Sequence, residues 1–403
     1  MGNAERDDQR PLRIGAAGLG RAFSLMLPTF RRHPLARIVA GADPRPEARQ
    51  LFADDFDARA YATVEDLCAD AEVEAVYIST PHHLHAEQAR MAASRGKHIL
   101  VEKPMALSTS ECLSMITAAR AAGVHLIVGH SHSFDAPIAR ARALVASGAY
   151  GPLRMVSALN FTDFLYRPRR PEELDTLKGG GVIFNQAPHQ VDILRLLGGG
   201  RLASVRACAG SWDQARPTQG AYTAFFTFEN GCCASLTYSG YAHFDSDEFC
   251  GSRDELGDAK DPTSYGHARK ALAGAAASDE ELALKASRNY GGPRYAERLR
   301  LAPPGHQHFG FVLASCEKAD LRPGPTGVTI YGDQSVMFEA CPVSDIPRRE
   351  VIDELHQAVV CGRPPVHDGE WGLATMEACL AILTSSKQGR EIQLEHQIGL
   401  RDE

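Results

Sequence analysis

A lysine at the end of a short apolar run is the residue with the clearest chemical potential. The run 98–101 is typical of a buried strand, and it stops at Glu102-Lys103-Pro104 because proline has no N–H to donate to a strand ladder. We expect Lys103 at the carboxyl edge of a sheet, where open α/β sheets bind their ligands. A partly desolvated ammonium there can exchange a proton with a substrate hydroxyl near neutral pH. The alternative is an ordinary solvated lysine.

A glycine turn near the N-terminus predicts a nucleotide site. A strand from Leu12 breaks at Gly18-Leu-Gly-Arg21, and a helical apolar period follows up to Phe30. This order lets the backbone approach a pyrophosphate that lies on the helix N-terminus. The third small residue of the usual fingerprint is Phe23 here, so a plain strand-to-helix turn is the alternative. The candidate cofactor-binding residues of this turn are Gly18, Leu19, Gly20 and Arg21.

An acidic residue follows at the spacing that a dinucleotide site requires. The strand 36–42 ends at Asp43, about twenty-five residues after the glycines, where a carboxylate accepts hydrogen bonds from an adenosine ribose. Because a carboxylate repels a 2′-phosphate, Asp43 favours NAD. Arg45 leaves NADP open, and a simple Asp-Pro turn is the alternative reading.

The next apolar strand ends at Thr80-Pro81, and three histidines open the helix that follows. Three histidines in four residues raise the question of a metal, but no cysteine or acid completes a ligand set, so we expect no metal. We assign Thr80, Pro81, His85, Glu102 and Lys103 to the cofactor side of the site.

The alternation of strands and helices predicts the fold. Residues 11–130 alternate β and α and indicate a Rossmann domain with a doubly wound parallel sheet. After Gly151-Pro152 the chain is rich in strands, and Asn230-Gly231 between alternating apolar residues marks a hairpin, so the C-terminal domain is built on a mostly antiparallel open sheet. The predicted boundaries are 1–135 for the Rossmann domain, 136–347 for the substrate and oligomerisation domain, with a lid or interface arm at 251–304, and 348–403 for helices that pack back on the body.

Composition excludes several classes of partner. The 403 residues carry 43 basic and 50 acidic side chains, a net charge of −7, which gives no electrostatic footprint for nucleic acid or for an anionic membrane. The charged start lacks the apolar core of a signal peptide, and no run of eighteen apolar residues occurs. Ten scattered cysteines without a C-x-x-C pair suggest reduced thiols. We expect a cytoplasmic protein that acts on a small molecule and that forms a homo-oligomer through the open face of the C-terminal sheet.

Together these strand-end residues resemble the Gfo/Idh/MocA family of nicotinamide-dependent oxidoreductases. Glu102-Lys103-Pro104 is the most specific element, and the resemblance implies that Lys103 contacts the nicotinamide ribose and the reacting hydroxyl. A second family motif matches Gly180-Gly181 through Asp192 and implies His189 as the acid/base partner. Where the family usually has aspartate, this chain has Asn185, which cannot accept a proton. A single helix would place Asn185 and His189 on one face.

The segment from Tyr166 to Asp192 resembles the branch of bacterial phthalate 4,5-cis-dihydrodiol dehydrogenases. The resemblance implies a dicarboxylate, for which arginines offer forked donors, and the alternative is a solvated arginine face. His130 and His132 are two apart at a strand end and point the same way. The predicted substrate-binding residues are Asn185, Tyr166, Arg167, Arg169, Arg170, His130 and His132.

These features predict oxidation of an aromatic cis-dihydrodiol to a catechol. The substrate would bind between the domains, hydride would pass to NAD, and Lys103 with His189 would take the hydroxyl proton. Three alternatives stay open. They are a sugar or cyclitol dehydrogenase, a lyase or decarboxylase that uses tightly bound NAD transiently, and a non-catalytic NAD-binding regulator.

Overall fold

The first part of the chain forms a six-stranded parallel sheet in the computed structural model, which describes residues 8–129, 132–274, 278–295 and 305–400. The strand order is β3-β2-β1-β4-β5-β6, and every neighbouring pair is parallel. This order reverses between β1 and β4, the switch point of a doubly wound sheet, so the predicted Rossmann architecture is confirmed. The strands are β1 (Leu12–Ala17), β2 (Ala36–Ala42), β3 (Arg59–Tyr61), β4 (Ala75–Ile78), β5 (His98–Glu102) and β6 (Leu126–Gly129).

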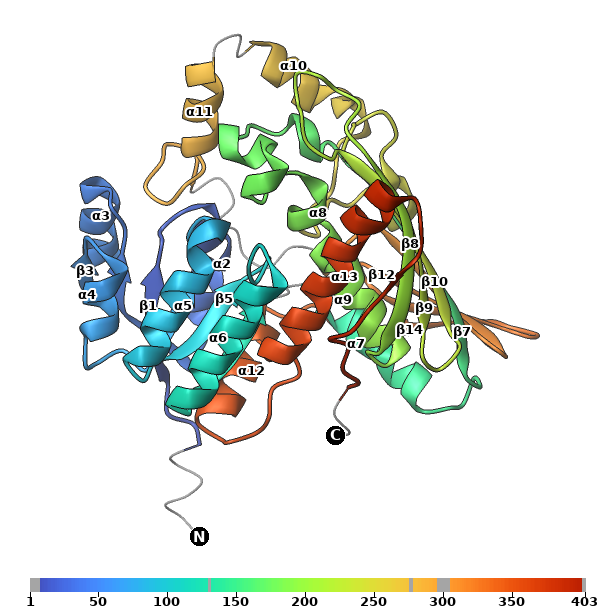
Figure 1. Ribbon diagram of the computed structural model, residues 1–403, viewed down its shortest axis with the longest axis horizontal. Coiled ribbons are helices and arrows are strands. Elements are labelled where there is room, and N and C mark those ends of the chain that lie inside the picture. Colours follow the sequence, from blue (N-terminus) through green and yellow to red (C-terminus); the bar gives the residue numbers. More distant parts are fainter. Residues whose placement is uncertain (1–7, 130–131, 275–277, 296–304, 401–403) are drawn as a thin grey trace. The chain divides into compact units, whose positions relative to one another are not determined.

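Helices cover this sheet because its apolar strands are buried on both faces. Helices α5 and α6 pack side by side, as Figure 1 shows. Helix α6 begins after Ser108, whose hydroxyl caps the helix by accepting a hydrogen bond from the Glu111 N–H. The helices are α2 (Arg21–Arg32), α3 (Pro46–Phe56), α4 (Val64–Ala69), α5 (His85–Ser94), α6 (Thr109–Ala122) and, from the C-terminal part, α12 (Arg349–Val359), with a 3₁₀ turn η1 (His82–Leu84).

A nine-stranded sheet follows, in the order β14-β13-β12-β11-β7-β10-β9-β8-β15. Among the described strands of this second sheet only the β7–β10 pair is parallel, so the predicted mostly antiparallel sheet is confirmed. The β9–β10 hairpin turns at Asn230-Gly231, where Gly231 has a φ of 83°. The strands are β7 (Leu153–Phe161), β8 (Leu202–Gly210), β9 (Ala221–Phe228), β10 (Cys233–Ser239), β11 (Phe311–Cys316), β12 (Ala319–Gly324), β13 (Gly327–Gly332), β14 (Val336–Ala340) and β15 (Ile392–Gln393).

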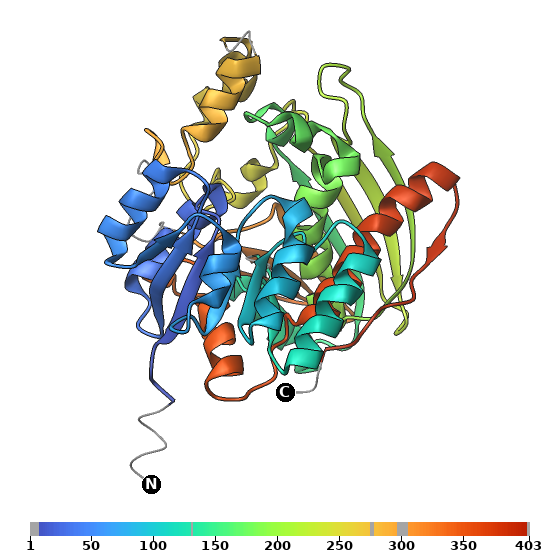
Figure 2. The same ribbon diagram turned by 60° about the vertical axis from the view of Figure 1, so that its left-hand side comes forward.

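One face of this large sheet carries helices and the other is open. Helices α7 and α9 pack on the strands, and the α13 hydroxyls of Ser385 and Ser386 accept hydrogen bonds from β8, so α13 runs along the same sheet (Figure 2). The helices are α7 (Ala136–Ala146), α8 (Gly181–Asn185), α9 (Ala187–Gly198), α10 (His267–Gly274), α11 (Ser278–Ala286) and α13 (Gly369–Gln388). The 3₁₀ turns are η2 (Phe164–Tyr166), η3 (Pro171–Leu174), η4 (Thr176–Lys178), η5 (Ser246–Cys250) and η6 (Pro262–Ser264).

The chain divides into two compact units whose boundaries differ from those expected. The described part of the first unit is 8–129, 283–295 and 344–373, and that of the second is 132–274, 278–282, 305–343 and 374–400. The described parts of the predicted arm 251–304 and of the C-terminal segment 348–403 are therefore each divided between the two units. The second boundary falls inside α11 and the last one inside α13.

Two structural features are absent from the described residues. No helix there is long and apolar enough to cross a membrane. No cluster of three His, Cys, Asp or Glu side chains in those residues has a metal-binding arrangement.

Candidate active-site residues

The glycine turn after β1 leaves open space at the start of α2. Gly18 has a φ of 87°, and a Cβ there would lie 2.9 Å from Thr80 Cγ2, so only glycine fits. A Cβ on Gly20, the N-cap of α2, would meet no atom within 4 Å. The backbone is therefore exposed where a pyrophosphate would lie on the helix N-terminus, and the turn fits the cofactor that the sequence predicts.

Asp43 stands at the end of β2 beside this turn. Its Oδ2 accepts a hydrogen bond from the Leu19 N–H at 2.9 Å, and its Oδ1 lies 2.9 Å from Nε of Arg45. Arg45 also donates from Nη2 to the Leu19 carbonyl at 2.8 Å. The acid therefore fixes the glycine turn, and its charge is partly balanced by the arginine two residues on.

Phe23, which departs from the small residue of the fingerprint, lies in an aromatic cluster. Its ring is 6.0 Å from that of Phe52 on α3 and 5.2 Å from that of Tyr290. Gly41 makes room on β2, because a Cβ there would come 2.6 Å from Phe52. The helix is thus held to the sheet by aromatic packing instead of close contact at a glycine.

His85 connects two of the predicted strand ends. Its Nδ1 lies 2.9 Å from the Pro104 carbonyl and its Nε2 3.0 Å from the Thr80 carbonyl. Burial lowers the pKa of His85, and a neutral imidazole has one N–H, so one carbonyl at a time receives a hydrogen bond. The prediction that the His85 side chain binds the cofactor does not match a ring that is 0% exposed. Its place is that of a positioning residue between the turns.

Lys103 follows β5 at the same edge as the glycine turn, Asp43 and Thr80, because the carboxyl ends of parallel strands share one edge. The Lys103–Pro104 peptide bond is cis. Next to it, Glu102 accepts a hydrogen bond from the Tyr77 hydroxyl at 2.7 Å. Pro81 precedes the turn η1. The cofactor-side residues predicted on the first unit therefore converge on one edge of its sheet.

His189 lies in the first turn of α9 in the second unit. Its ring packs edge-on against that of His132, with centroids 4.7 Å apart, and 4.7 Å from the ring of Phe309. Nδ1 of His132 is 3.2 Å from a carboxylate oxygen of Asp135. Two predicted residues, His132 and His189, are thus brought together, whereas His130 lies outside the described residues. Phe309 is not among the predicted site residues, because its contact with His189 joins segments more than a hundred residues apart.

The expected single helix over Asn185 and His189 is wrong. The helix breaks at Gln186, and α9 restarts with Pro188 in its first turn, where a missing N–H costs nothing. The Asn185 amide donates to the carbonyls of Gly179 and Gly181, at 3.2 and 2.8 Å. Asn185 thereby fixes the glycine turn that leads into the motif.

The three predicted carboxylate-binding arginines already face acidic side chains. Arg167 contacts Asp163 at 2.6 Å and Glu255 at 3.1 Å. The guanidinium of Arg169 lies 3.7 Å above the ring of Phe164, and burial lowers its pKa to about 10. The remaining ion pairs are Arg169 with Glu173, and Arg170 with Glu172 and Glu173. The charges that were expected to bind a dicarboxylate are therefore balanced internally.

A Rossmann sheet with an open glycine turn and an acid after β2, followed by a large antiparallel sheet, defines a nicotinamide nucleotide-dependent oxidoreductase. Family models agree. Residues 12–130 match an oxidoreductase family with an NAD-binding Rossmann fold, and residues 138–254 match the GFO/IDH/MocA C-terminal domain. The chain belongs to the Gfo/Idh/MocA family of oxidoreductases, as its motifs predict.

Individual relatives extend over almost the whole chain. It is 46% identical to a 1-carboxy-3-chloro-3,4-dihydroxycyclohexa-1,5-diene dehydrogenase of Comamonas testosteroni, over 93% of this chain and 95% of the relative. A crystal structure of a putative dehydrogenase from Bordetella bronchiseptica has 43% identity and a TM-score of 0.89, covering 95% of this chain and all of the other. The WlbA dehydrogenase of Bordetella pertussis, solved with NADH and UDP-GlcNAcA, shares the fold at 21% identity and a TM-score of 0.67, covering 96% and 99%.

Proposed function

We propose that the protein oxidises a carboxylated cyclohexadiene cis-diol to the corresponding catechol, with NAD as the acceptor. The observation that carries the proposal is the 46% identity over 93% of the chain with a dehydrogenase named for such a substrate. Loss of the hydroxyl proton and of the hydrogen on its carbon gives a hydroxydienone, which tautomerises to an aromatic ring. Aromatisation makes the overall reaction effectively irreversible.

The proposal assigns the proton chemistry to Lys103 and His189. Lys103, in its neutral form, takes the proton from the substrate hydroxyl, and His189 assists in carrying it away. Asn185 takes no proton, because an amide is not a base at neutral pH. When bound, NAD supplies the acceptor for the hydrogen that leaves the diol carbon with its electron pair.

Asp43 supports NAD over NADP. Asp43 directly follows β2, the strand end at which an acid in this fold hydrogen-bonds the adenosine ribose, and a 2′-phosphate there would meet a negative charge. Arg45 is engaged with Asp43 and with the Leu19 carbonyl, so it would have to leave both to bind a phosphate. We therefore expect faster turnover with NAD than with NADP at equal concentrations.

The prediction of a phthalate-type dicarboxylate needs two arginines that are available to carboxylates. Arg167, Arg169 and Arg170 each contact acids of their own unit, which supports a substrate with a single carboxylate instead.

An assay of NADH absorbance tests these assignments. The purified protein is incubated with a carboxylated cyclohexadiene cis-diol, a phthalate dihydrodiol and a panel of polyols, each with NAD and with NADP. We expect turnover of the monocarboxylated diol with NAD. Lys103→Met should reduce kcat by about 10²–10⁴-fold, since this is what a general base contributes. His189→Asn should give a smaller loss, and the exposed control Lys178→Met should give none.

Three outcomes would contradict the proposal. Unchanged turnover in Lys103→Met would remove the assigned base. Preference for a polyol would indicate a sugar or cyclitol dehydrogenase. Product formation without accumulation of NADH would indicate a lyase that oxidises its substrate only transiently.

A further inference from the structure

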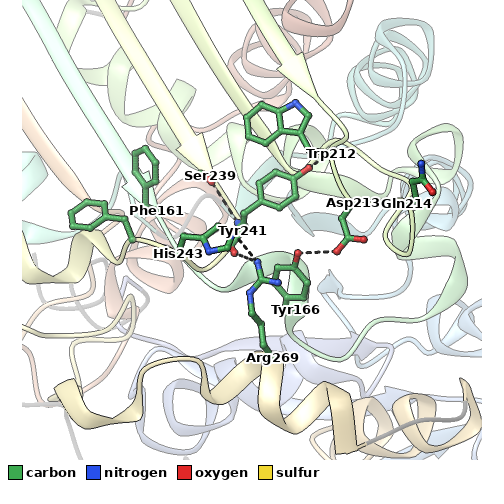
Figure 3. Close-up of a pocket in the computed structure, with 10 residues that line it drawn as sticks. Phe161, Tyr166, Trp212, Asp213, Gln214, Ser239, Tyr241, His243 and Arg269 are labelled. Carbon is green, nitrogen blue, oxygen red and sulfur yellow. Dashed lines mark hydrogen bonds between the residues drawn. The ribbon is translucent and has the colours of Figure 1, made fainter.

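A pocket of about 490 Å³ in the second unit has no assigned role. Its aromatic walls are Phe161, Tyr166, Trp212, Tyr241 and Phe244, and its polar lining is Asp213, Gln214, Ser239, His243 and Arg269 (Figure 3). Neither His189 nor His132 is among the described residues that line it. The pocket is therefore distinct from the histidine pair at the start of α9.

Trp212 is the most unusual residue of this pocket, because its side chain is 72% exposed. Its ring stacks on that of Tyr241 at 4.9 Å, with 17° between the planes. Gly210 makes this possible, since a Cβ there would come 2.2 Å from the indole nitrogen, and Gly220 does the same for the Tyr241 ring at 2.5 Å. Two glycines thus keep a large apolar surface facing solvent, which gains nothing for folding and is typical of a binding surface.

Two of the tyrosine rings are held in place by their hydroxyls. The Tyr241 hydroxyl accepts a hydrogen bond from the backbone N–H of Trp212 at 2.7 Å, and the Tyr166 hydroxyl donates to Asp213 at 2.8 Å. The guanidinium of Arg269 lies 3.6 Å above the Tyr166 ring. Rigid rings bind a planar ligand without a cost of ordering side chains.

Arg269 supplies the charge of the pocket. It projects from α10 between Tyr166 and His243 (Figure 3), and its Nη2 donates to the Tyr241 carbonyl and contacts His243 at 3.3 Å. Among the described residues its Nε has no hydrogen-bond partner. Asp213, the one acid of the lining, already accepts from Tyr166 and from the Ala215 N–H. The guanidinium therefore retains donor capacity for an anion, whereas the carboxylate is satisfied.

We propose that this pocket is an accessory binding site for an aromatic carboxylate, with the ring stacked against Trp212 and Tyr241 and the carboxylate held by Arg269. The proposed catechol product belongs to that chemical class, but the site does not depend on the proposed function, because binding requires neither NAD nor turnover.

Trp212 provides a direct test. The chain has two tryptophans, and Trp371 is 1% exposed, so a change in fluorescence on ligand addition reports on Trp212. The protein is titrated without NAD with benzoate, with neutral benzamide and with non-aromatic cyclohexanecarboxylate. We expect a saturable change with benzoate and much weaker responses to the other two. Trp212→Phe should lose the signal, and binding of benzoate to that variant is followed by calorimetry.

Substitutions in the pocket test whether the Arg269 charge binds the carboxylate and whether benzoate binds at this site. Arg269→Gln should weaken benzoate binding about tenfold or more, which is the effect of one charge-assisted hydrogen bond. Asp213→Asn, which still accepts from Tyr166, should bind benzoate more tightly because it removes the like charge. Lys178→Met, at an exposed side chain outside the pocket, is the control. These last two variants test the proposal if Arg269→Gln fails to fold.

Several results would overturn it. One is a response that does not saturate, and another is equal binding of benzoate and benzamide. Loss of benzoate binding in His189→Asn would place the ligand at the histidine pair instead. If wild-type protein ignores benzoate while Trp212→Ala changes its sedimentation coefficient, the rings form a contact between copies of the chain.

Discussion

The side chain of His98, in the first unit, stabilises the fold through a hydrogen bond with the backbone. His98 on β5 stacks on His125, with ring centroids 5.4 Å apart, and its Nδ1 accepts a hydrogen bond from the His125 N–H at 3.0 Å. A proton on that nitrogen would break the bond. Burial, with a smaller contribution from His125, lowers the pKa of His98 to about 4. The neutral ring is therefore part of the folded structure.

This predicts a pH dependence with a definite sign. In the unfolded chain His98 titrates near its ordinary value of about 6.5. As pH falls from about 6.5 to about 4, His98 binds a proton in the unfolded state but stays neutral in the folded state, so the free energy of unfolding decreases. Above this window the contribution is fully present. His98→Asn, whose amide oxygen can accept the same N–H, should lose less stability between these pH values. Urea unfolding at both ends of the window measures the difference, and equal losses in both proteins would contradict the assignment.

At the scale of elements, the segment 283–295 is anchored on the first unit by one aromatic ring. Tyr290 is fully buried, its ring packs on Phe23, and its hydroxyl donates to Asp55 at 2.6 Å. On the other side of the boundary, Glu281 of α11 accepts from Arg216 at 2.8 Å and from the Arg169 N–H at 2.7 Å. The same helix region is thus fixed to each unit by different side chains.

Removal of this ring should release the segment. Tyr290→Ala is expected to lower the free energy of unfolding by about 3–5 kcal/mol, the usual cost of deleting a buried aromatic ring. Tyr290→Phe keeps the packing and should cost about 1 kcal/mol for the lost hydrogen bond. Urea unfolding gives both values, and hydrogen exchange over 283–295 should accelerate in the alanine variant. A loss below the phenylalanine value would show that the cluster does not hold the segment.

For the whole molecule, the open face of the nine-stranded sheet is the feature that bears on assembly. Its register places Met155, Phe225 and Phe338 on the face opposite to the helices, and each is more than two-fifths exposed. Apolar side chains in this number on a broad sheet are typical of an interface. Self-association through this face remains our prediction.

Charge on this face should therefore separate the subunits. Met155→Asp combined with Phe225→Asp is expected to reduce the sedimentation coefficient to that of a monomer, because two buried carboxylates would lack partners. Circular dichroism should be unchanged, since both side chains already face solvent within one chain. Leu177→Asp, at a side chain that is 94% exposed away from the sheet, is the control. A wild-type monomer, or an unaffected oligomer, would rule out this interface.

The sequence alone determined the architecture and one edge of the site, because both depend on local signals. The period of apolar residues and the breakers Gly18 and Pro104 define each strand end, and parallel strands bring such ends together without further information. The strands β11, β12 and β14 escaped prediction. Pro323 interrupts the pattern of β12, and the place of all three strands depends on long-range pairing.

Only the tertiary structure decided which polar side chains are available to a ligand. An arginine looks the same in the sequence whether its side chain faces solvent or an acid. Arg167, for example, donates a hydrogen bond to Glu255, which lies eighty-eight residues away in the chain. The ring of His85 was buried by a turn nineteen residues further on. The residues that line the aromatic pocket come from four separate segments, so no local sequence pattern predicts the pocket. Hydrogen bonds and ion pairs between distant residues contribute free energy that the local spacing of residues does not encode. These pairs decide which polar side chains stabilise the fold and which can bind a ligand.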